Sequence, residues 1–143
     1  MPNTTSNIVL YATLAARYPV INIANGAVSA TTLLITAAST ATIITDVLFR
    51  SADTISRNFD IIICATGSQG TAENARVQVG IPAGSGNNGS TAIASLAALI
   101  PSLFDIDLAG NRVMTLESGQ SIYVKNLATT AGAFFITAKA RDY

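Results

Sequence analysis

The sequence contains no histidine, and this absence removes several kinds of chemistry. Ser-His-Asp and Cys-His catalytic arrangements need an imidazole, and most zinc and copper sites use one as a ligand. No other cluster of polar residues suggests a catalytic site. We therefore expect a protein that is not an enzyme and that carries no cofactor and no metal.

Cysteine is almost absent as well. Cys64 is the only cysteine, so no disulfide can form within the chain. It lies in the apolar run "DIIICA", where a thiol behaves as a small hydrophobic side chain. We expect Cys64 to be buried and unreactive.

Charge is scarce and balanced, with eight basic and eight acidic residues making up 11% of the chain. Soluble domains usually carry roughly 25% charged residues, so this surface must consist mainly of small polar side chains. Few charges then repel a neighbouring molecule, which favours an assembly subunit over a freely diffusing monomer. The basic residues are spread singly along the chain, so we expect no basic patch and no nucleic-acid partner.

Long apolar runs are also missing. No stretch approaches the roughly 18 consecutive apolar residues of a membrane helix, so a membrane partner is not expected. The opening "MPNTTSN" lacks the basic residues of a signal peptide. We expect synthesis in the cytoplasm without cleavage.

What the sequence does contain is β-strand pattern. Thr, Ile, Val and Leu dominate several runs, other runs alternate between apolar and polar residues, and turn signals recur at roughly 8–12-residue spacing. Only "TAIASLAALIPS" favours a helix, which Pro101 would end. The predicted strands lie within 31–36, 40–50, 57–66, 73–82, 103–108, 112–127 and 132–143. These features predict an all-β fold, an antiparallel β-sandwich or jelly-roll-like domain with at most one short helix.

The first thirty residues differ from the rest, and we predict an N-terminal arm over 1–30 and a sandwich domain over 31–143. The arm is too apolar to be a solvated tail, so it should find burial on a partner molecule. An alternative stays open, in which residues 8 to 14 form the first strand of the sandwich. The candidate partner-binding residues of the arm are Tyr11, Leu14, Tyr18 and Val20.

A second group of candidate partner-binding residues lies in "FRSADTISRNFD", around a bend. Arg50, Asp53, Arg57 and Asp60 alternate in charge there, and the first three are the candidate contact residues. They could form solvated surface ion pairs, which contribute about 0–1 kcal/mol each. At a subunit contact the same charges would set register and orientation.

Two motifs suggest ligands. "GSGNNG", residues 84–89, matches G-x-G-x-x-G, but Pro82 separates it from the preceding strand and no βα units follow, so we interpret it as a surface loop. Asp105 and Asp107 would put two carboxylates on one face of a strand. Such a pair could bind calcium, take part in acid–base chemistry, discourage edge pairing or face Arg112.

The order of the predicted strands resembles a known family. The segments "TATIITDVLF", "FDIIICATGS", "ARVQVGIP", "LESGQSIYVKN" and "AFFITAKARDY" follow one another as in the small β-sandwich virion proteins of tailed bacteriophages, including capsid decoration (cement) proteins. Their pattern L-x-x-G-x-x-I-x-V before the last strand corresponds here to Leu116, Gly119, Ile122 and Val124. The resemblance covers roughly residues 31–143.

This resemblance implies a non-enzymatic structural protein of a virion, assembled in the host cytoplasm. It would be a capsid decoration subunit that stabilises the head by binding between major capsid proteins. Its partners would be the major capsid protein and copies of itself, most simply as a trimer. The alternatives are a structural protein of the phage neck or tail, or a jelly-roll carbohydrate-binding module.

Overall fold

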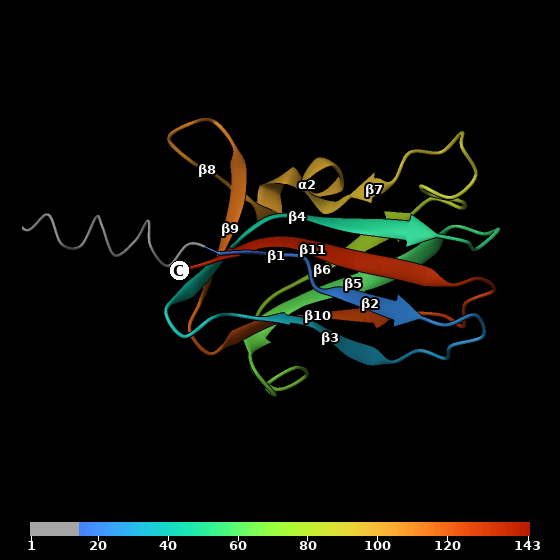
Figure 1. Cartoon of the computed structure of the whole chain (residues 1–143). Helices are drawn as coiled ribbons and strands as arrows, with labels where there is room; N and C mark the ends of the chain where they lie inside the picture. The colour runs from blue at the N-terminus through green and yellow to red at the C-terminus, as the bar shows by residue number, and fades with distance from the viewer. Residues whose placement is uncertain (1–14) are drawn as a thin grey trace, which may run out of the picture.

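The structure, a computed structural model, describes residues 15–143. Two antiparallel sheets stack face to face with the core between them (Figure 1). The first sheet contains β1 (Ala15–Arg17), β2 (Val20–Ile23), β4 (Ala41–Ser51), β7 (Ala94–Ser95), β8 (Asp105–Ile106), β9 (Arg112–Glu117) and β11 (Phe134–Asp142). The second contains β3 (Thr31–Thr36), β5 (Arg57–Ala65), β6 (Glu73–Ile81) and β10 (Gln120–Asn126). The all-β sandwich predicted from the sequence is confirmed.

The chain moves back and forth between the two sheets, which gives a jelly-roll order. In the first sheet β2 and β1 lie along β11, which is followed by β4 and then by β9 and β8. In the second sheet the order is β3, β10, β5 and β6. A seven-stranded and a four-stranded sheet joined by such crossovers resemble the arrangement of a double-sheet jelly roll.

The core follows the two-residue period of the strands. Along β11 the residues Phe134, Ile136, Ala138 and Ala140 are buried, as their alternation predicts. Phe134 packs edge-on against Phe59 with ring centroids 4.9 Å apart, an arrangement that aromatic pairs prefer.

The turn between β9 and β10 contains Gly119. Gly119 has a φ of +84°, a left-handed conformation that glycine adopts without a steric penalty. The turn places Leu116 and Ile122 in the core, where both are fully buried. This turn carries the chain from one sheet to the other, because β9 belongs to the first and β10 to the second.

The helical segment is shorter than predicted. Only α2 (Leu96–Leu99) and the 3₁₀ turn η1 (Pro101–Leu103) are helical. The residues before them form β7, which pairs with β4. Asp46 accepts hydrogen bonds from Ser95 Oγ and Ala97 N, so this β4 carboxylate fixes the start of α2. None of the helices in the described part of the chain is long and apolar enough to cross a membrane.

The domain boundary predicted at residue 31 has to be corrected. Residues 15–23 are paired with β11 through β1 and β2, so they form part of the first sheet. Arg17 strengthens this pairing, because its Nε lies 2.8 Å from Asp142 Oδ2 and its Nη2 donates to Thr36 O over 2.6 Å. The remainder of the arm, residues 1–14, with Tyr11 and Leu14 and the alternative first strand, lies outside the described residues.

Candidate functional site

Four loops gather at one end of the sandwich, on the right in Figure 1. We call this surface the loop end and define it as residues 24–30, 52–56, 82–93 and 127–133. Asp53 is the only Asp, Glu, Lys or Arg in these four segments. The loop end is therefore almost free of charged side chains.

Asp53 holds the loop end together from inside. Its side chain is fully buried, and its Oδ2 accepts hydrogen bonds from Arg57 Nε at 2.7 Å and from Ala131 N at 2.8 Å. Its Oδ1 accepts from Ile55 N at 2.9 Å. Burial raises the pKa of Asp53, but the hydrogen bonds from Arg57, Ala131 and Ile55 outweigh it and hold the pKa below its usual value.

Further backbone contacts join the same loops. Gly84 N donates to Asp53 O over 3.0 Å, and Gly26 N donates to Thr130 O over 2.9 Å. Gly132 lies so close to Ala52 that a Cβ on it would come within 2.5 Å of Ala52 backbone atoms. Because all four loops are cross-linked in this way, the loop end is a preformed surface.

Three large aliphatic side chains of the loop end are accessible among small polar residues. Val28 is 69% exposed, Ile55 is 56% exposed and Ile93 is 45% exposed. Nearby, Arg50 extends from β4 with its guanidinium carbon 5.5 Å from the centre of the Phe135 ring, and it donates to Asn87 Oδ1 over 3.0 Å. The loop end thus presents three large aliphatic side chains on a rigid, uncharged support.

These positions correct part of the predicted partner-binding group. Asp53 has no exposed side-chain surface, so it builds the loop end from inside and cannot itself contact a partner. Arg57 binds Asp53, and its side chain remains 17% exposed. Arg50 is exposed, as a contact residue must be. The signals that sequence analysis missed are Val28 and Ile55, two aliphatic residues within turn-rich segments.

Tyr18 and Val20 lie on the outer face of the first sheet. They are 63% and 59% exposed, and Val20 is paired with Thr137 of β11. Neither side chain belongs to the core, so both are accessible to a partner.

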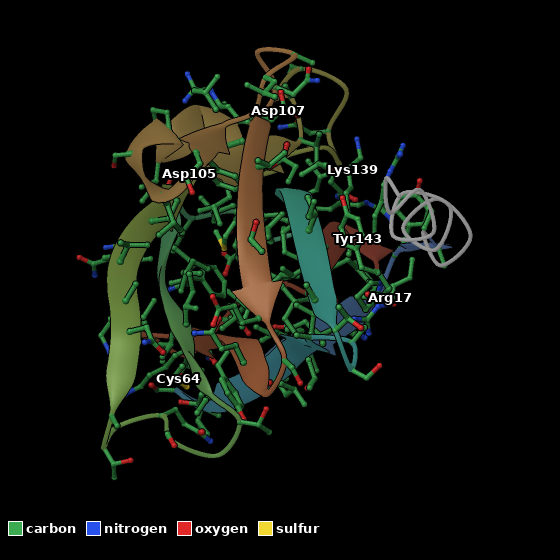
Figure 2. All side chains as sticks on the ribbon, turned by 90° about the vertical axis from the view of Figure 1, so that its left-hand side faces the viewer. Arg17, Cys64, Asp105, Asp107, Lys139 and Tyr143 are labelled. Atoms are coloured by element: carbon green, nitrogen blue, oxygen red, sulfur yellow. The ribbon has the colours of Figure 1, made fainter. Side chains whose placement is uncertain are left out.

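A groove of about 610 Å³ crosses the same outer face. Its lining includes Tyr18, Asp107, Arg112, Lys139, Arg141 and Tyr143. Figure 2 shows Asp107, Lys139 and Tyr143 following one another down one side of the molecule.

Three of the eight basic residues, Arg112, Lys139 and Arg141, line this groove together, and the expectation that no basic patch forms is wrong. β9 and β11 flank β4, which brings these distant sequence positions side by side.

The two ligand motifs prove to be turns. Asp107 Oδ1 accepts from Ala109 N and Asn111 N and so closes the turn after β8. Asp105 lies apart from it, as Figure 2 shows, and the predicted strand with both carboxylates on one face is not formed. Within residues 15–143 no group of three or more His, Cys, Asp or Glu side chains could hold a metal ion.

The glycine-rich motif is a loop, as predicted. Gly84, Gly86 and Gly89 all have positive φ, and the nearest helix, α2, begins only at Leu96.

Cys64 is buried on the outer face of the second sheet, with Ile62 and Tyr123. The Tyr123 hydroxyl accepts a hydrogen bond from Gly67 N over 2.9 Å, which ties the loop after β5 to this face. Burial raises the pKa of the Cys64 thiol. The prediction of a buried cysteine is confirmed.

Comparisons with known proteins add one structural similarity. No family model matches the sequence. No curated protein matches it. The fold is similar to a chain from "Bacillus endospore appendages form a novel family of disulfide-linked pili", with 16% sequence identity, a TM-score of 0.43, and coverage of 91% of this chain and 88% of that chain. These comparisons show no family, and the loop end and the groove are the surfaces on which a functional proposal rests.

Proposed function

We propose that this chain is a non-enzymatic structural subunit of a virion, of the capsid decoration type. The observation that carries the proposal is the loop end, a rigid and uncharged surface that exposes Val28 and Ile55. Desolvating such a surface costs little, because no charge has to leave water and no loop has to be ordered on binding. This is the property that a subunit needs when it docks permanently on a preformed shell.

The fold is compatible with this proposal but also with other functions. Jelly rolls occur in viral capsid proteins, but also in lectins and cupins. Fold alone therefore does not define the function, which has to be argued from the surface. The low charge of the whole chain supports assembly, because little electrostatic repulsion opposes close packing of neighbouring copies.

In the proposed assembly, the loop end contacts the major capsid protein and residues 1–14 reach a neighbouring copy. A stable contact buries about 1,200–2,000 Å² in total, which is more than the exposed aliphatic side chains alone supply. Val28 and Ile55 would form its centre, with the polar loops around them as the rim. A threefold position in the shell would make the subunit a trimer.

The test is incorporation into virus particles at a fixed stoichiometry. The full chain should sediment with particles, and the double variant Val28→Asp, Ile55→Asp should remain folded and stay in the supernatant. Leu108→Asp is the matched control, because Leu108 is a fully exposed aliphatic residue in the turn after β8, outside the loop end. If the double variant is incorporated as well as the control, the loop end is not the docking surface. If the unaltered chain is absent from particles, the virion proposal fails.

A second candidate function is a carbohydrate-binding module, and the groove is the observation that favours it. Tyr18 and Tyr143 both line it, whereas Tyr123 is buried. Tyrosine offers an apolar ring face and a polar hydroxyl at one site, which suits a sugar.

A further inference from the structure

The groove on the first sheet combines features that specify a ligand class. It runs across β11 and β4, from Tyr18 beside β1 to the turn of residues 107–111. A volume of about 610 Å³ lies in the range of small-molecule sites, roughly 300–1,000 Å³. Ile43, Thr45, Arg112, Lys139 and Arg141 of this lining are on strands β4, β9 and β11, so the sheet positions them before any ligand binds. Asp107 and Asn111 come from the turn between β8 and β9.

The first feature is a set of cations without a carboxylate partner among the described residues. Within the described residues, no carboxylate oxygen lies within 4.0 Å of Arg112, Lys139 or Arg141. The strand partner of Lys139 is Asp46, but that carboxylate is bound to Ser95 and Ala97 at the start of α2.

The strand partners of the other two cations carry no charge. Arg141 is paired with Ile43 on β4 and with Ala16 on β1. Arg112 is paired with Ile106, and its Nη1 donates to Pro101 O over 3.4 Å. The groove therefore concentrates positive charge in a chain whose formal net charge is zero. An anionic group entering the groove would find charge-assisted hydrogen-bond donors that are already positioned.

The second feature is a set of groups that a purely anionic ligand does not need. Asp107 also lines the groove, and within residues 15–143 only its Oδ1 takes part in hydrogen bonds. Its Oδ2 can accept from a hydroxyl but would repel a second anion. Asn111 adds an amide, and Tyr18 and Tyr143 add ring faces. A chain of repeated anionic groups, such as an acidic peptide or a nucleic acid, fits this mixture poorly.

We propose that the groove binds an acidic saccharide, a sugar that carries a carboxylate. Lys139 and Arg141 would bind the carboxylate, Asp107 and Asn111 would bind ring hydroxyls, and Tyr18 would pack against the apolar face of the sugar. This inference rests on the second candidate function, because it names the ligand of that site. It does not require incorporation into a particle.

The experiment measures binding of three probes to the full chain by isothermal titration calorimetry: a galacturonic acid trimer, a neutral galactose trimer and hexaglutamate. The galacturonate trimer should bind, and the other two should bind at least about tenfold more weakly. Lys139→Gln and Arg141→Gln should each raise its Kd about tenfold, as expected for the loss of a charge-assisted hydrogen bond. Tyr18→Ala, which changes a side chain 63% exposed, should weaken binding without affecting folding.

Lys125→Gln is the matched control. Lys125 is the other lysine of the chain and lies on β10 in the second sheet, away from the groove. It should leave the Kd unchanged. Binding of none of the three probes overturns both this inference and the carbohydrate-binding candidate.

The remaining outcomes distinguish a failure of the acidic-saccharide inference from a failure of the carbohydrate-binding candidate. The neutral galactose trimer could bind as tightly as the galacturonate trimer and lose this binding in Tyr18→Ala. That result keeps the carbohydrate-binding candidate and overturns the assignment of an acidic saccharide as the ligand. Equal binding of hexaglutamate shows that the groove recognises charge alone and overturns the saccharide assignment. If Lys125→Gln raises the Kd of the galacturonate trimer as much as Lys139→Gln does, the binding site is not this groove.

Discussion

Arg57 Nε donates to Asp53 Oδ2 over 2.7 Å, and the carboxylate of this ion pair is fully buried beneath the loop end. The same oxygen accepts from Ala131 N, 78 residues further along the chain. One side chain therefore joins the loop after β4 to the loop after β10. The surface that we propose as a docking site depends on this buried carboxylate.

Asp53→Ala is expected to lower the free energy of unfolding by about 3 kcal/mol, because it removes one partner of a buried ion pair and leaves Arg57 and Ala131 N unsatisfied. Chemical denaturation monitored by circular dichroism measures the change. Asp60→Ala is the matched control, since Asp60 forms its ion pair with Arg76, 2.7 Å away, at the surface. If both variants lose the same stability, Asp53 is not the central tie of the loop end.

The same carboxylate predicts a pH dependence. The pKa of Asp53 is held below its usual value of 3.8, so its stabilising contribution is complete above about pH 4 and disappears as the pH falls through the folded-state pKa. The melting temperature of the unaltered protein should fall as the pH drops below about 4. The melting temperature of Asp53→Asn should fall less steeply over the same pH range. Glu73, whose pKa its hydrogen bonds to Arg76 lower to about 2, adds a contribution lost between about pH 4.5 and 2. Glu73→Gln therefore separates the two carboxylates.

Gly132→Ala should destabilise the protein by about 3 kcal/mol, the upper end for overpacking, because the new Cβ would meet backbone rather than side-chain atoms. Those atoms are the carbonyl group of Ala52 and the nitrogen of Asp53, all 2.5 Å away. Gly80→Ala is the control, since its Cβ would meet only the Asn58 side chain, at 3.3 Å. Equal stability of the two variants would show that the loops can separate without cost.

The fold was predictable because strand periodicity is a local property. The buried face of β11 and the Gly119 turn each follow from a few neighbouring residues. The burial of Asp53 was not predictable in this way, since "FRSADTISRNFD" contains no trace of the loop that covers it. The one available signal was Gly132 in "TTAGA", because a glycine among small residues can mark a close approach of two chain segments.

The groove was missed for a related reason. Lys139 and Arg141 lie two residues apart on one strand, but Arg112 is far from both along the sequence. They converge because the jelly-roll crossovers place β9 and β11 on opposite sides of β4. Recognising the cluster required the strand order, which single-sequence patterns do not specify.

Tyr123→Phe should increase the rate at which a thiol reagent labels Cys64 in the native protein. The variant removes the hydroxyl that accepts from Gly67 N, so the loop after β5 should open more often above the thiol. A net hydrogen bond contributes about 0.5–1.5 kcal/mol, which corresponds to an increase of about 2- to 10-fold. Tyr143→Phe, in the groove on the other sheet, should leave the rate unchanged. An unchanged rate in Tyr123→Phe would mean that another element controls access to Cys64.

Two deletions test the N-terminal arm, and the structure determines where each must end. Removing residues 1–14 keeps β1 and β2, so this variant should fold with unchanged stability but fail to assemble. Removing residues 1–25 also deletes the Arg17–Asp142 ion pair and the buried Ile23, and it leaves β11 as an open edge. We therefore expect the longer deletion to be strongly destabilised and to aggregate, because an unprotected edge strand pairs with other chains. Thermal denaturation measures folding, and light scattering with particle sedimentation measures assembly. If the shorter deletion unfolds, residues 1–14 belong to the sandwich core; if it assembles normally, they are not the arm that binds a neighbouring copy.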